Sequence, residues 1–337
     1  MPAHVKSRHR GQPRSTRRGG PLDGHRTKRR LSKSRRRKSA ARRGDKRGKK
    51  LPKVLYLIAA LIVLFLLLFS KSSYWDTASK IAIVFNGSDG PQIVVFDKEL
   101  EEITQILIPK DTETQVSRQL GTWKIGSVWQ LGENEKLDGK ILAESITFHL
   151  KFPVYAWADR GVMGFVEGGP FSFLKAIILP YKTNLSFADR LKLAQFTLRV
   201  REFKKSEIKL SQTSAVRPTK LIDGSEGYQL TGLVPAGILA LFSDTQIAQS
   251  QTRVVIHDAT AKYKLAEEVG EIIEVMGAKV TAIKKEDNGN YDCKVTGADK
   301  KSLEKVALFL GCEKSAEEVT GSFDLEIYLG SEFPKRF

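Results

Sequence analysis

The stretch RVVIHDATAKYKLAEEVGEIIEVMGAKVTAI, residues 253–283, gives the clearest fold signal in the chain. It opens with a short apolar strand, Arg253–His257, and continues in the segment Tyr263–Met276. Apolar residues recur in that segment at helical spacing, which predicts a helix with one face packed on a sheet. Gly277 supplies the usual helix end, and Ala278–Ile283 is the next strand. The pattern predicts a strand–helix–strand unit.

The residues that follow extend this unit. The turn residues Asp287–Asn290 lead into a strand candidate, Tyr291–Val295. A second helix begins after the capping signal Thr296–Asp299 and precedes a last strand, Phe323–Leu329. The order β-α-β-β-α-β predicts a small α/β sandwich over residues 252–337, with two helices on one face of a mixed sheet.

Cys293 and Cys312 are the only cysteines of the chain. Cys293 lies late in a predicted strand, and Cys312 follows a helix that runs back beside it, so the two can meet. A disulfide bond and a pair of buried thiols both fit this arrangement, and disulfides persist outside the cytoplasm. Two cysteines without clustered histidines are too few for a structural metal site, and we expect none.

Upstream, residues 81–210 alternate strand and helix patterns. The strand candidates are Ile81–Phe85, Gln92–Phe96, Ile103–Ile108 and Phe152–Ala158. The helix candidates are Asp138–Leu150 and Phe187–Phe203. This alternation predicts a layered α/β domain, which together with a linker would occupy residues 72–251.

The strand end Ile106–Thr112, Ile-Leu-Ile-Pro-Lys-Asp-Thr, carries the most chemistry in this region. With Lys124–Gly126, the helix candidate at 139–150 and the strand candidate at 152–159, it resembles the LytR–CpsA–Psr family of extracytoplasmic phosphotransferases. The resemblance implies a transferase that uses Lys110 and Asp111, with Asp111 as a ligand of Mg²⁺, because phosphoryl transfer needs its developing charge offset.

Two departures weaken that implication. The motif arginine of the family is Lys110 here, and a lysine offers a point charge where an arginine offers a bidentate fork. The later arginine-rich run of the family has no counterpart, because Arg190, Arg199 and Arg201 lie on a segment that predicts an ordinary amphipathic helix. We therefore expect residues 81–210 to be a degenerate member, with Lys110 and Asp111 a solvated pair at a strand end.

Residues 252–333 resemble the LytR C-terminal domain family. The resemblance lies in Leu265-Ala266, in the helix-to-strand junction Met276–Val280 and in the closing residues Leu329–Phe333. It implies an accessory module that binds cell-envelope polymer or another protein, without catalytic residues. His257 ends a strand with no second group placed to orient it, which predicts a structural histidine.

Residues 1–50 are strongly basic. They carry 21 Lys and Arg against Asp23 and Asp45, while the whole chain has a net charge of +18, so the other residues sum to about −1. Such a segment buries too little apolar surface to fold, which predicts disorder. The basic segment has three alternative roles: it binds anionic inner-leaflet lipid, it binds nucleic acid, or it only determines the membrane topology. Stacking on nucleic-acid bases is excluded, because no aromatic residue lies between the charges.

The basic tail runs into Val54–Ser70, which has no charged residue and is flanked by Lys53 and Lys71. A bilayer core needs roughly 20 mostly apolar residues, so we expect a transmembrane signal anchor over residues 51–71. Its apolar core is longer than that of a cleaved signal peptide. Positive charge stays on the cytoplasmic side, which predicts a cytoplasmic tail and an extracytoplasmic remainder.

These expectations combine into an α/β chain with a disordered tail, one membrane helix, a layered domain and a small sandwich. The function they favour is a single-pass, non-catalytic envelope protein whose C-terminal module binds cell wall or protein, without a cofactor. The alternative is a phosphotransferase that attaches lipid-linked glycopolymer to the cell wall with Lys110, Asp111 and Mg²⁺. A third hypothesis is a tether between the membrane and an acidic partner or nucleoid.

Overall fold

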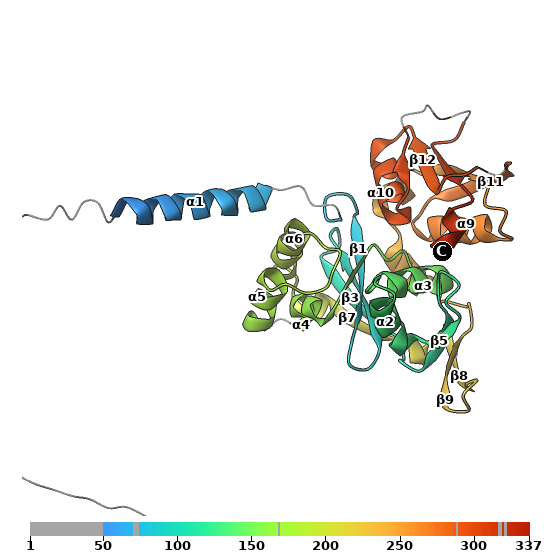
Figure 1. Cartoon of the computed structure of the whole chain (residues 1–337), viewed down its shortest axis with the longest axis horizontal. Coiled ribbons are helices and arrows are strands. Elements are labelled where there is room, and N and C mark those ends of the chain that lie inside the picture. The colour runs from blue at the N-terminus through green and yellow to red at the C-terminus, as the bar shows by residue number, and fades with distance from the viewer. Residues whose placement is uncertain (1–49, 70–73, 168, 288, 316–318, 320–321) are drawn as a thin grey trace, which may run out of the picture. The chain divides into compact units, whose positions relative to one another are not determined.

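The computed structural model describes residues 50–69, 74–167, 169–287, 289–315, 319 and 322–337 (Figure 1). The chain divides into two compact units, Met1–Leu55 and Tyr56–Phe337, and the description below concerns the second. Residues 1–49 lie outside the described residues, so the disorder and lipid binding predicted for them stay predictions. The predicted domain boundaries after residues 71 and 251 also stay predictions.

The structure overturns the predicted transmembrane helix. Helix α1 (Lys50–Phe69) does form over the apolar stretch. Among the described residues, no helix is long and apolar enough to cross a membrane.

The first sheet has the strand order β6-β1-β2-β3-β7. Its strands are β1 (Lys80–Asn86), β2 (Pro91–Asp97), β3 (Glu102–Leu107), β6 (Ala156–Ala158) and β7 (Lys205–Lys209). The first three form an antiparallel meander, whereas β6 and β7 pair in parallel at the two edges. The three predicted meander strands are confirmed.

The predicted strand Phe152–Ala158 is too long, because only its last three residues pair with β1. Lys151 takes a left-handed conformation with a φ of 58°, and Pro153 has no amide hydrogen to donate to a ladder. Phe152 and Val154 are buried among core side chains beside the sheet instead.

The sheet is the middle of three layers (Figure 1). Successive side chains of a strand point to opposite faces of the sheet. In β1, Ala82 and Val84 accordingly lie in one core, and Ile81 and Ile83 lie in the other. The first core includes residues of α2 (Ile125–Asn134) and α3 (Lys140–Leu150). The second includes residues of the helices α4 (Gly164–Glu167), α5 (Pro170–Ile178) and α6 (Phe187–Thr197).

The sequence patterns predicted α3 but missed α2 and α5, and they made α6 too long. α6 begins with a capping box in which Ser186 and Asp189 satisfy each other's backbone amides. The helix ends at Thr197, because Leu198 and Phe203, two of the apolar residues that suggested a longer helix, are exposed rather than packed.

A second sheet has the order β5-β4-β9-β8. Its strands are β4 (Thr112–Gln115), β5 (Thr122–Lys124), β8 (Val216–Lys220) and β9 (Glu226–Leu230). Two short helices follow it, α7 (Ala236–Leu239) and α8 (Thr245–Gln249). β4 begins directly after the turn that carries Lys110 and Asp111, so this sheet holds one side of the turn.

The C-terminal sheet has the order β11-β10-β14-β12-β13. Its strands are β10 (Arg253–Asp258), β11 (Lys279–Lys285), β12 (Cys293–Gly297), β13 (Glu313–Lys314) and β14 (Leu325–Leu329). The predicted element order is confirmed, with β13 added. Residues of α9 (Leu265–Val275) and α10 (Lys300–Leu310) share one core with the same face of β10 and β14, so both helices cover that face.

Candidate functional site

The turn that carries Lys110 and Asp111 is held on two sides. Thr112 closes it by donating its hydroxyl to the carbonyl of the proline three residues earlier, over 2.7 Å. The Gly126 amide of α2 donates to the Lys110 carbonyl, and the Tyr228 amide of β9 donates to the Asp111 carbonyl, each over 2.9 Å. The backbone of the turn is therefore fixed by α2 and β9, while Lys110 remains exposed and Asp111 half-buried.

A cavity of about 300 Å³ opens beside this turn. It brings together two segments that the sequence separates, the strand-end motif and the start of α2. Its lining residues are Asn86, Gly87, Ser88, Gly90, Lys110, Asp111, Lys124, Gly126 and Ser127. We call this cavity the Lys110 pocket.

Two glycines permit the close approach of backbone in the Lys110 pocket. A Cβ at Gly126 would lie 2.9 Å from the Cβ of Lys110. Gly90 has a φ of +133°, and a Cβ there would lie 2.5 Å from the Ile108 carbonyl oxygen. Larger residues at either position would displace the Lys110 turn, so these glycines shape the pocket.

The charge of the Lys110 pocket is mainly positive. Lys124 Nζ lies 2.7 Å from an Asp223 carboxylate oxygen, and that hydrogen bond raises the pKa of Lys124. Lys110 and Asp111 make no side-chain hydrogen bond or ion pair among the residues that the structure describes, although the Asp111 charge also acts on Lys124. The pocket thus holds one cation that is free to meet a ligand and one that is already partly neutralised.

The first turn of α2 adds amide donors to the same pocket. The residue before α2, Lys124, makes no side-chain capping bond to it, and the first amides of a helix have no partner within the helix. One of them, at Gly126, is used by the Lys110 carbonyl. The remaining donors, the helix dipole and the hydroxyls of Ser88 and Ser127 suit a phosphate group.

The donor set of the Lys110 pocket does not suit a resident Mg²⁺. Asp111 is its only carboxylate, and no group of three or more His, Cys, Asp or Glu side chains that could hold a metal occurs in the described part of the chain. Mg²⁺ needs six oxygen ligands in octahedral geometry. We therefore derive no step through a metal.

The three arginines considered from the sequence do not line the Lys110 pocket. Arg190 lies on α6, where it donates to the Leu179 carbonyl over 3.1 Å and stacks on the ring of Tyr181. Arg199 and Arg201 are exposed after the end of α6. The prediction that all three arginines lie on one amphipathic helix is right for Arg190, but α6 ends before Arg199 and Arg201.

Buried side chains fill the space between the first sheet and helices α2 and α3. Val84, Ile93 and Ile106 of the sheet are fully buried there, as are Val128 and Ile141 of the helices. The part of the α/β region behind the Lys110 pocket is therefore a packed core.

His257 has a partner that the sequence did not reveal. Its Nδ1 is hydrogen-bonded to the Glu286 carboxylate, and its ring stacks on Tyr328 with centroids 4.3 Å apart. The expectation of no orienting group is wrong because the parallel pairing of β10 with β11 brings Glu286 alongside. Parallel register is a long-range property that local periodicity does not encode. The His257 side chain is only 7% exposed, as a structural histidine would be.

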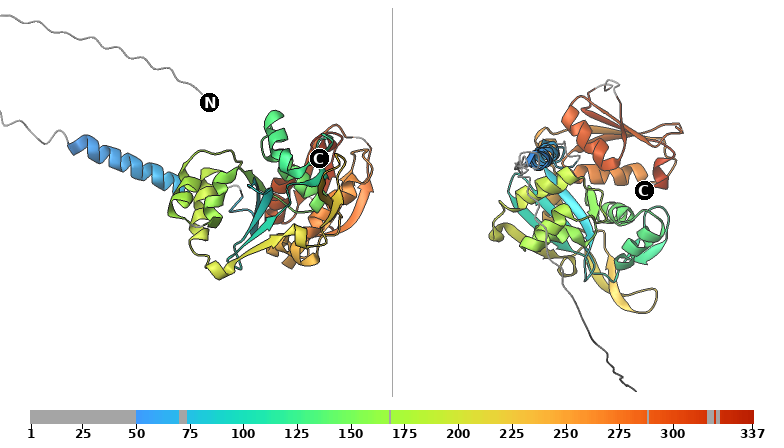
Figure 2. Two further views of the ribbon diagram at one scale, coloured as in Figure 1. Left: turned by 90° about the horizontal axis from the view of Figure 1, so that it is seen from below. Right: turned by 60° about the vertical axis from the view of Figure 1, so that its left-hand side comes forward.

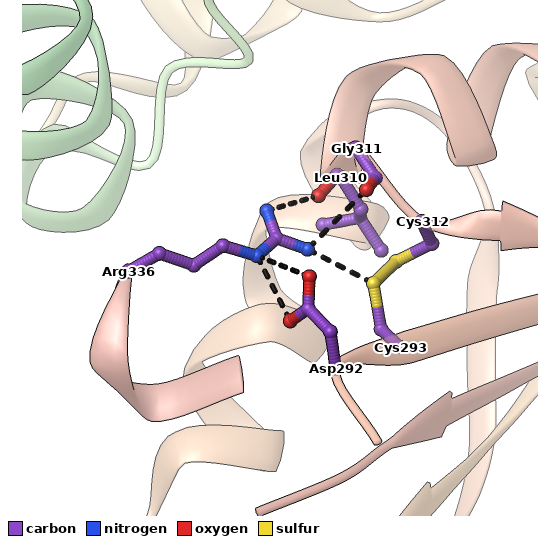
Figure 3. The surroundings of a disulfide bond; sticks show 6 residues. All are labelled: Asp292, Cys293, Leu310, Gly311, Cys312 and Arg336. Carbon is purple, nitrogen blue, oxygen red and sulfur yellow. Dashed lines mark hydrogen bonds and ion pairs between the residues drawn. A yellow bond between two sulfur atoms is a disulfide. The ribbon is translucent and has the colours of Figure 1, made fainter. Parts of the chain in front are cut away.

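Cys293 and Cys312 form a disulfide bond (Figure 3). Arg336 lies against it, with a guanidinium nitrogen 3.0 Å from Cys293 Sγ and another 2.8 Å from an Asp292 carboxylate oxygen. The same side chain donates to the Leu310 carbonyl at the end of α10 over 2.6 Å. Of the two arrangements that the sequence left open, the structure has the disulfide.

The sequence also gave no sign of a second cavity, of about 500 Å³, between α3 and the end of α10. Its polar lining includes Lys140, Glu144 and Asn184. Glu144 is held by Arg118 through two hydrogen bonds of 2.7 Å, and Asn184 by Tyr74 and the Trp157 amide. These groups are already satisfied within the protein.

Neither a family model nor a curated protein matches the sequence. Solved structures match part of it. The Lin1025 protein from Listeria innocua is 11% identical over 45% of this chain and 91% of its own, with a TM-score of 0.33. TagV of B. subtilis is 12% identical over 45% of this chain and 91% of its own, with a TM-score of 0.34.

A third solved structure is the LytR-CPS2A-psr family protein YwtF (TagT) with bound octaprenyl pyrophosphate lipid, 12% identical over 46% of this chain and 85% of its own, with a TM-score of 0.33. LytR–CpsA–Psr proteins are thus among the structures similar to this chain. The scores are too low to carry an argument about activity, and the resemblance to the LytR C-terminal domain family stays a prediction.

Proposed function

We propose that the Lys110 pocket binds the pyrophosphate of a lipid-linked glycopolymer and that the protein transfers the glycopolymer to the cell wall. The observation that carries this proposal is the convergence of Lys110, Lys124 and the start of α2 on one cavity. Cations and backbone amides held in place before the reaction stabilise phosphoryl charge without reorganisation. The resemblance of residues 81–159 to the LytR–CpsA–Psr family supplies the substrate class.

The proposed transfer gives a role to Lys110, to Asp111 and to the amides at the start of α2. An acceptor hydroxyl of the wall attacks the phosphorus that bears the glycopolymer and forms a new P–O bond. The bond from that phosphorus to the bridging oxygen breaks, and the bridging oxygen leaves as part of the lipid phosphate. Asp111 takes the proton of the attacking hydroxyl, while Lys110 and the α2 amides offset the charge that develops on the phosphate oxygens.

Binding without transfer is the second candidate function. It is favoured by the buried apolar side chains packed behind the pocket, and by the lysine at position 110, which lacks the bidentate fork of an arginine. On this hypothesis the pocket holds a phosphate-bearing envelope polymer, and the C-terminal sandwich adds the module for wall or protein binding that its sequence predicts.

We further propose that the folded part works outside the cytoplasm. The disulfide between Cys293 and Cys312 supports this location, because cytosolic thiols are kept reduced. The proposal does not depend on a membrane helix.

The experiment measures binding and transfer separately on the full chain. The substrate is a glycopolymer joined by pyrophosphate to a polyprenyl lipid and labelled in its sugar, and the acceptor is purified peptidoglycan. The variants are Asp111→Asn, Lys110→Ala and, as a control, Lys279→Ala at an exposed position of β11.

Label in the wall that disappears in Asp111→Asn but persists in Lys279→Ala supports the transferase. Binding that needs Lys110, with no label transferred by any form of the protein, supports the second candidate. Binding that is equal in Lys110→Ala and the unchanged protein would contradict both.

A further inference from the structure

Helix α5 has an apolar face that the fold leaves uncovered. Phe171 is 81% exposed, Leu174 52% and Ile178 61%, and Leu179, directly after the helix, 49%. Residues 171, 174 and 178 recur at the spacing of one helical face. On an ordinary surface helix this stripe would face the core.

The core side of α5 is a different face of the helix. Ala176 is fully buried, and Phe173 and Ile177 pack against the core cluster. Gly164 of α4 approaches this side so closely that a Cβ would lie 2.0 Å from the Ser172 carbonyl oxygen. α5 is therefore already packed against the core through one apolar face, and the exposed residues form a second apolar face of the same helix.

More exposed apolar residues follow the neighbouring helix. α5 and α6 lie side by side (Figures 1 and 2), and after α6 Leu198 is 74% exposed and Phe203 75%. The chain then returns to α4, where Lys205 Nζ donates to the Val166 carbonyl over 3.4 Å. The helices α4–α6 and the turn after them thus form one lobe, which we call the helical lobe.

The helical lobe is basic. Residues 164–204, from the start of α4 to the end of the turn after α6, contain seven Lys and Arg against three acids, a balance of +4 within a folded part that sums to about −1. One of the three acids, Asp189, is fully buried and accepts hydrogen bonds from backbone amides. Lys175, Arg199 and Arg201 are exposed and have no carboxylate partner among the described residues.

We propose that the helical lobe docks on the surface of an anionic lipid bilayer, with Phe171, Leu174 and Ile178 in the interface. Exposed aromatic and aliphatic side chains on one face of a helix, with cations beside them, are the features of an interfacial amphipathic helix. Each basic residue near an anionic surface adds attraction. The apolar residues alone would also suit an uncharged protein surface, whereas the cations without carboxylate partners favour the anionic headgroups of a bilayer.

The experiment uses the full chain with a fluorescent reporter at one position. Because both native cysteines are in the disulfide, Ile178→Cys gives a single thiol for an environment-sensitive dye. Ile222→Cys is the matched control, since Ile222 is 85% exposed but lies outside the helical lobe. A reporter at a defined residue is needed because the basic tail could itself bring the chain to vesicles.

On vesicles that contain phosphatidylglycerol, the dye at residue 178 should shift to the blue and be quenched by a lipid-borne quencher. The dye at residue 222 should do neither. Arg199→Glu with Arg201→Glu should remove most of the shift, and so should Phe171→Ser with Leu174→Ser. Unchanged thermal unfolding of both pairs would show that the loss is not a folding defect.

Equal spectra at residues 178 and 222 on vesicles that bind the chain would overturn the proposal. A shift at residue 178 without vesicles that grows with protein concentration would also overturn it, because it would identify a second copy of the chain as the partner. A shift of the same size on neutral phosphatidylcholine vesicles would contradict the role of the cations.

Discussion

The ammonium of Lys305 lies 2.6 Å from a carboxylate oxygen of Asp244, and both side chains are almost fully buried. Asp244 precedes α8, whereas Lys305 lies on α10 of the C-terminal region. Asp244 also accepts the Ser79 hydroxyl over 2.6 Å. One buried carboxylate thus joins the start of the first sheet, the segment before the C-terminal sheet and α10.

Lys305→Met should destabilise the protein by about 3–5 kcal/mol, because it leaves the Asp244 carboxylate buried without its cation. The measurement is the free energy of unfolding in denaturant. Lys301→Ala, at an exposed position of the same helix, is the control and should change this free energy little. A loss below about 1 kcal/mol for Lys305→Met would mean that water reaches the pair.

The same pair predicts a loss of stability in acid. Burial alone would raise the pKa of Asp244, but the hydrogen bonds from Lys305 and Ser79 outweigh it and hold the pKa below the ordinary value of 3.8. A carboxyl whose pKa is lower in the folded state contributes stability above the unfolded pKa and loses it as the pH falls through the folded pKa. Unfolding measured between pH 6 and pH 2 should show this loss below about pH 4.

Asp244→Asn is the comparison for the acid experiment. Its amide no longer titrates, so its stability should fall less steeply over the same pH range. Parallel curves for the two proteins would show that other carboxyl groups cause the loss in acid.

Removing the disulfide should cost about 3 kcal/mol of unfolding free energy by the chain-entropy relation, given the 19-residue separation of Cys293 and Cys312. Cys293→Ser with Cys312→Ser tests this without a reductant. Unfolding of the unchanged protein with and without dithiothreitol should give a difference of the same size. Equal stabilities would mean that Arg336 alone holds the end of α10.

Burial lowers the pKa of Lys98 to about 8, with the nearby Lys305 acting in the same direction. The unfolded chain therefore binds more protons than the folded chain between pH 8 and about 10.5, and stability should rise with pH over that range. The measurement is the carbon chemical shift next to the Lys98 nitrogen as the pH rises. A midpoint near 10.5 would contradict the burial of this ammonium.

Gly126→Ala should weaken phosphate binding, because a Cβ at this position meets the Cβ of Lys110 at 2.9 Å. Affinity for inorganic pyrophosphate, measured by calorimetry, should fall, whereas Gly237→Ala should leave it unchanged, since nothing lies within 4 Å of a Cβ there. Unchanged affinity in Gly126→Ala would place the anion elsewhere.

Local sequence patterns predicted the helices and strands that bury one regular face against a nearby part of the fold. The alternation in Ile81–Phe85 and the helical spacing in Tyr263–Met276 both report burial on a nearby surface, and both elements are present. α5 escaped prediction because Phe171 and Ile178 are exposed while Ala176 is buried. When apolar residues lie on two faces of a helix, the alternation of apolar and polar residues at helical spacing is lost, and the sequence pattern no longer indicates a helix.

The residues of the candidate site could be predicted from the sequence, but their arrangement around one cavity could not. Lys110 and Asp111 were found from the strand-end motif, and Lys124–Gly126 from the second motif, but their convergence depends on the Gly126 amide reaching the Lys110 carbonyl. This backbone contact depends on how the chain folds between residues 110 and 126, and local sequence patterns do not determine that path. The same holds for His257 and Glu286, which are 29 residues apart.

The strand order of the C-terminal sheet has a consequence for how the protein is made. β14 is the last strand in the chain, yet it pairs with both β10 and β12 at the centre of its sheet. Until residues 325–329 are available, β10 and β12 have no strand between them, and their facing edges keep unpaired backbone N–H and C=O groups. The C-terminal sheet can therefore be completed only when β14 pairs with both strands.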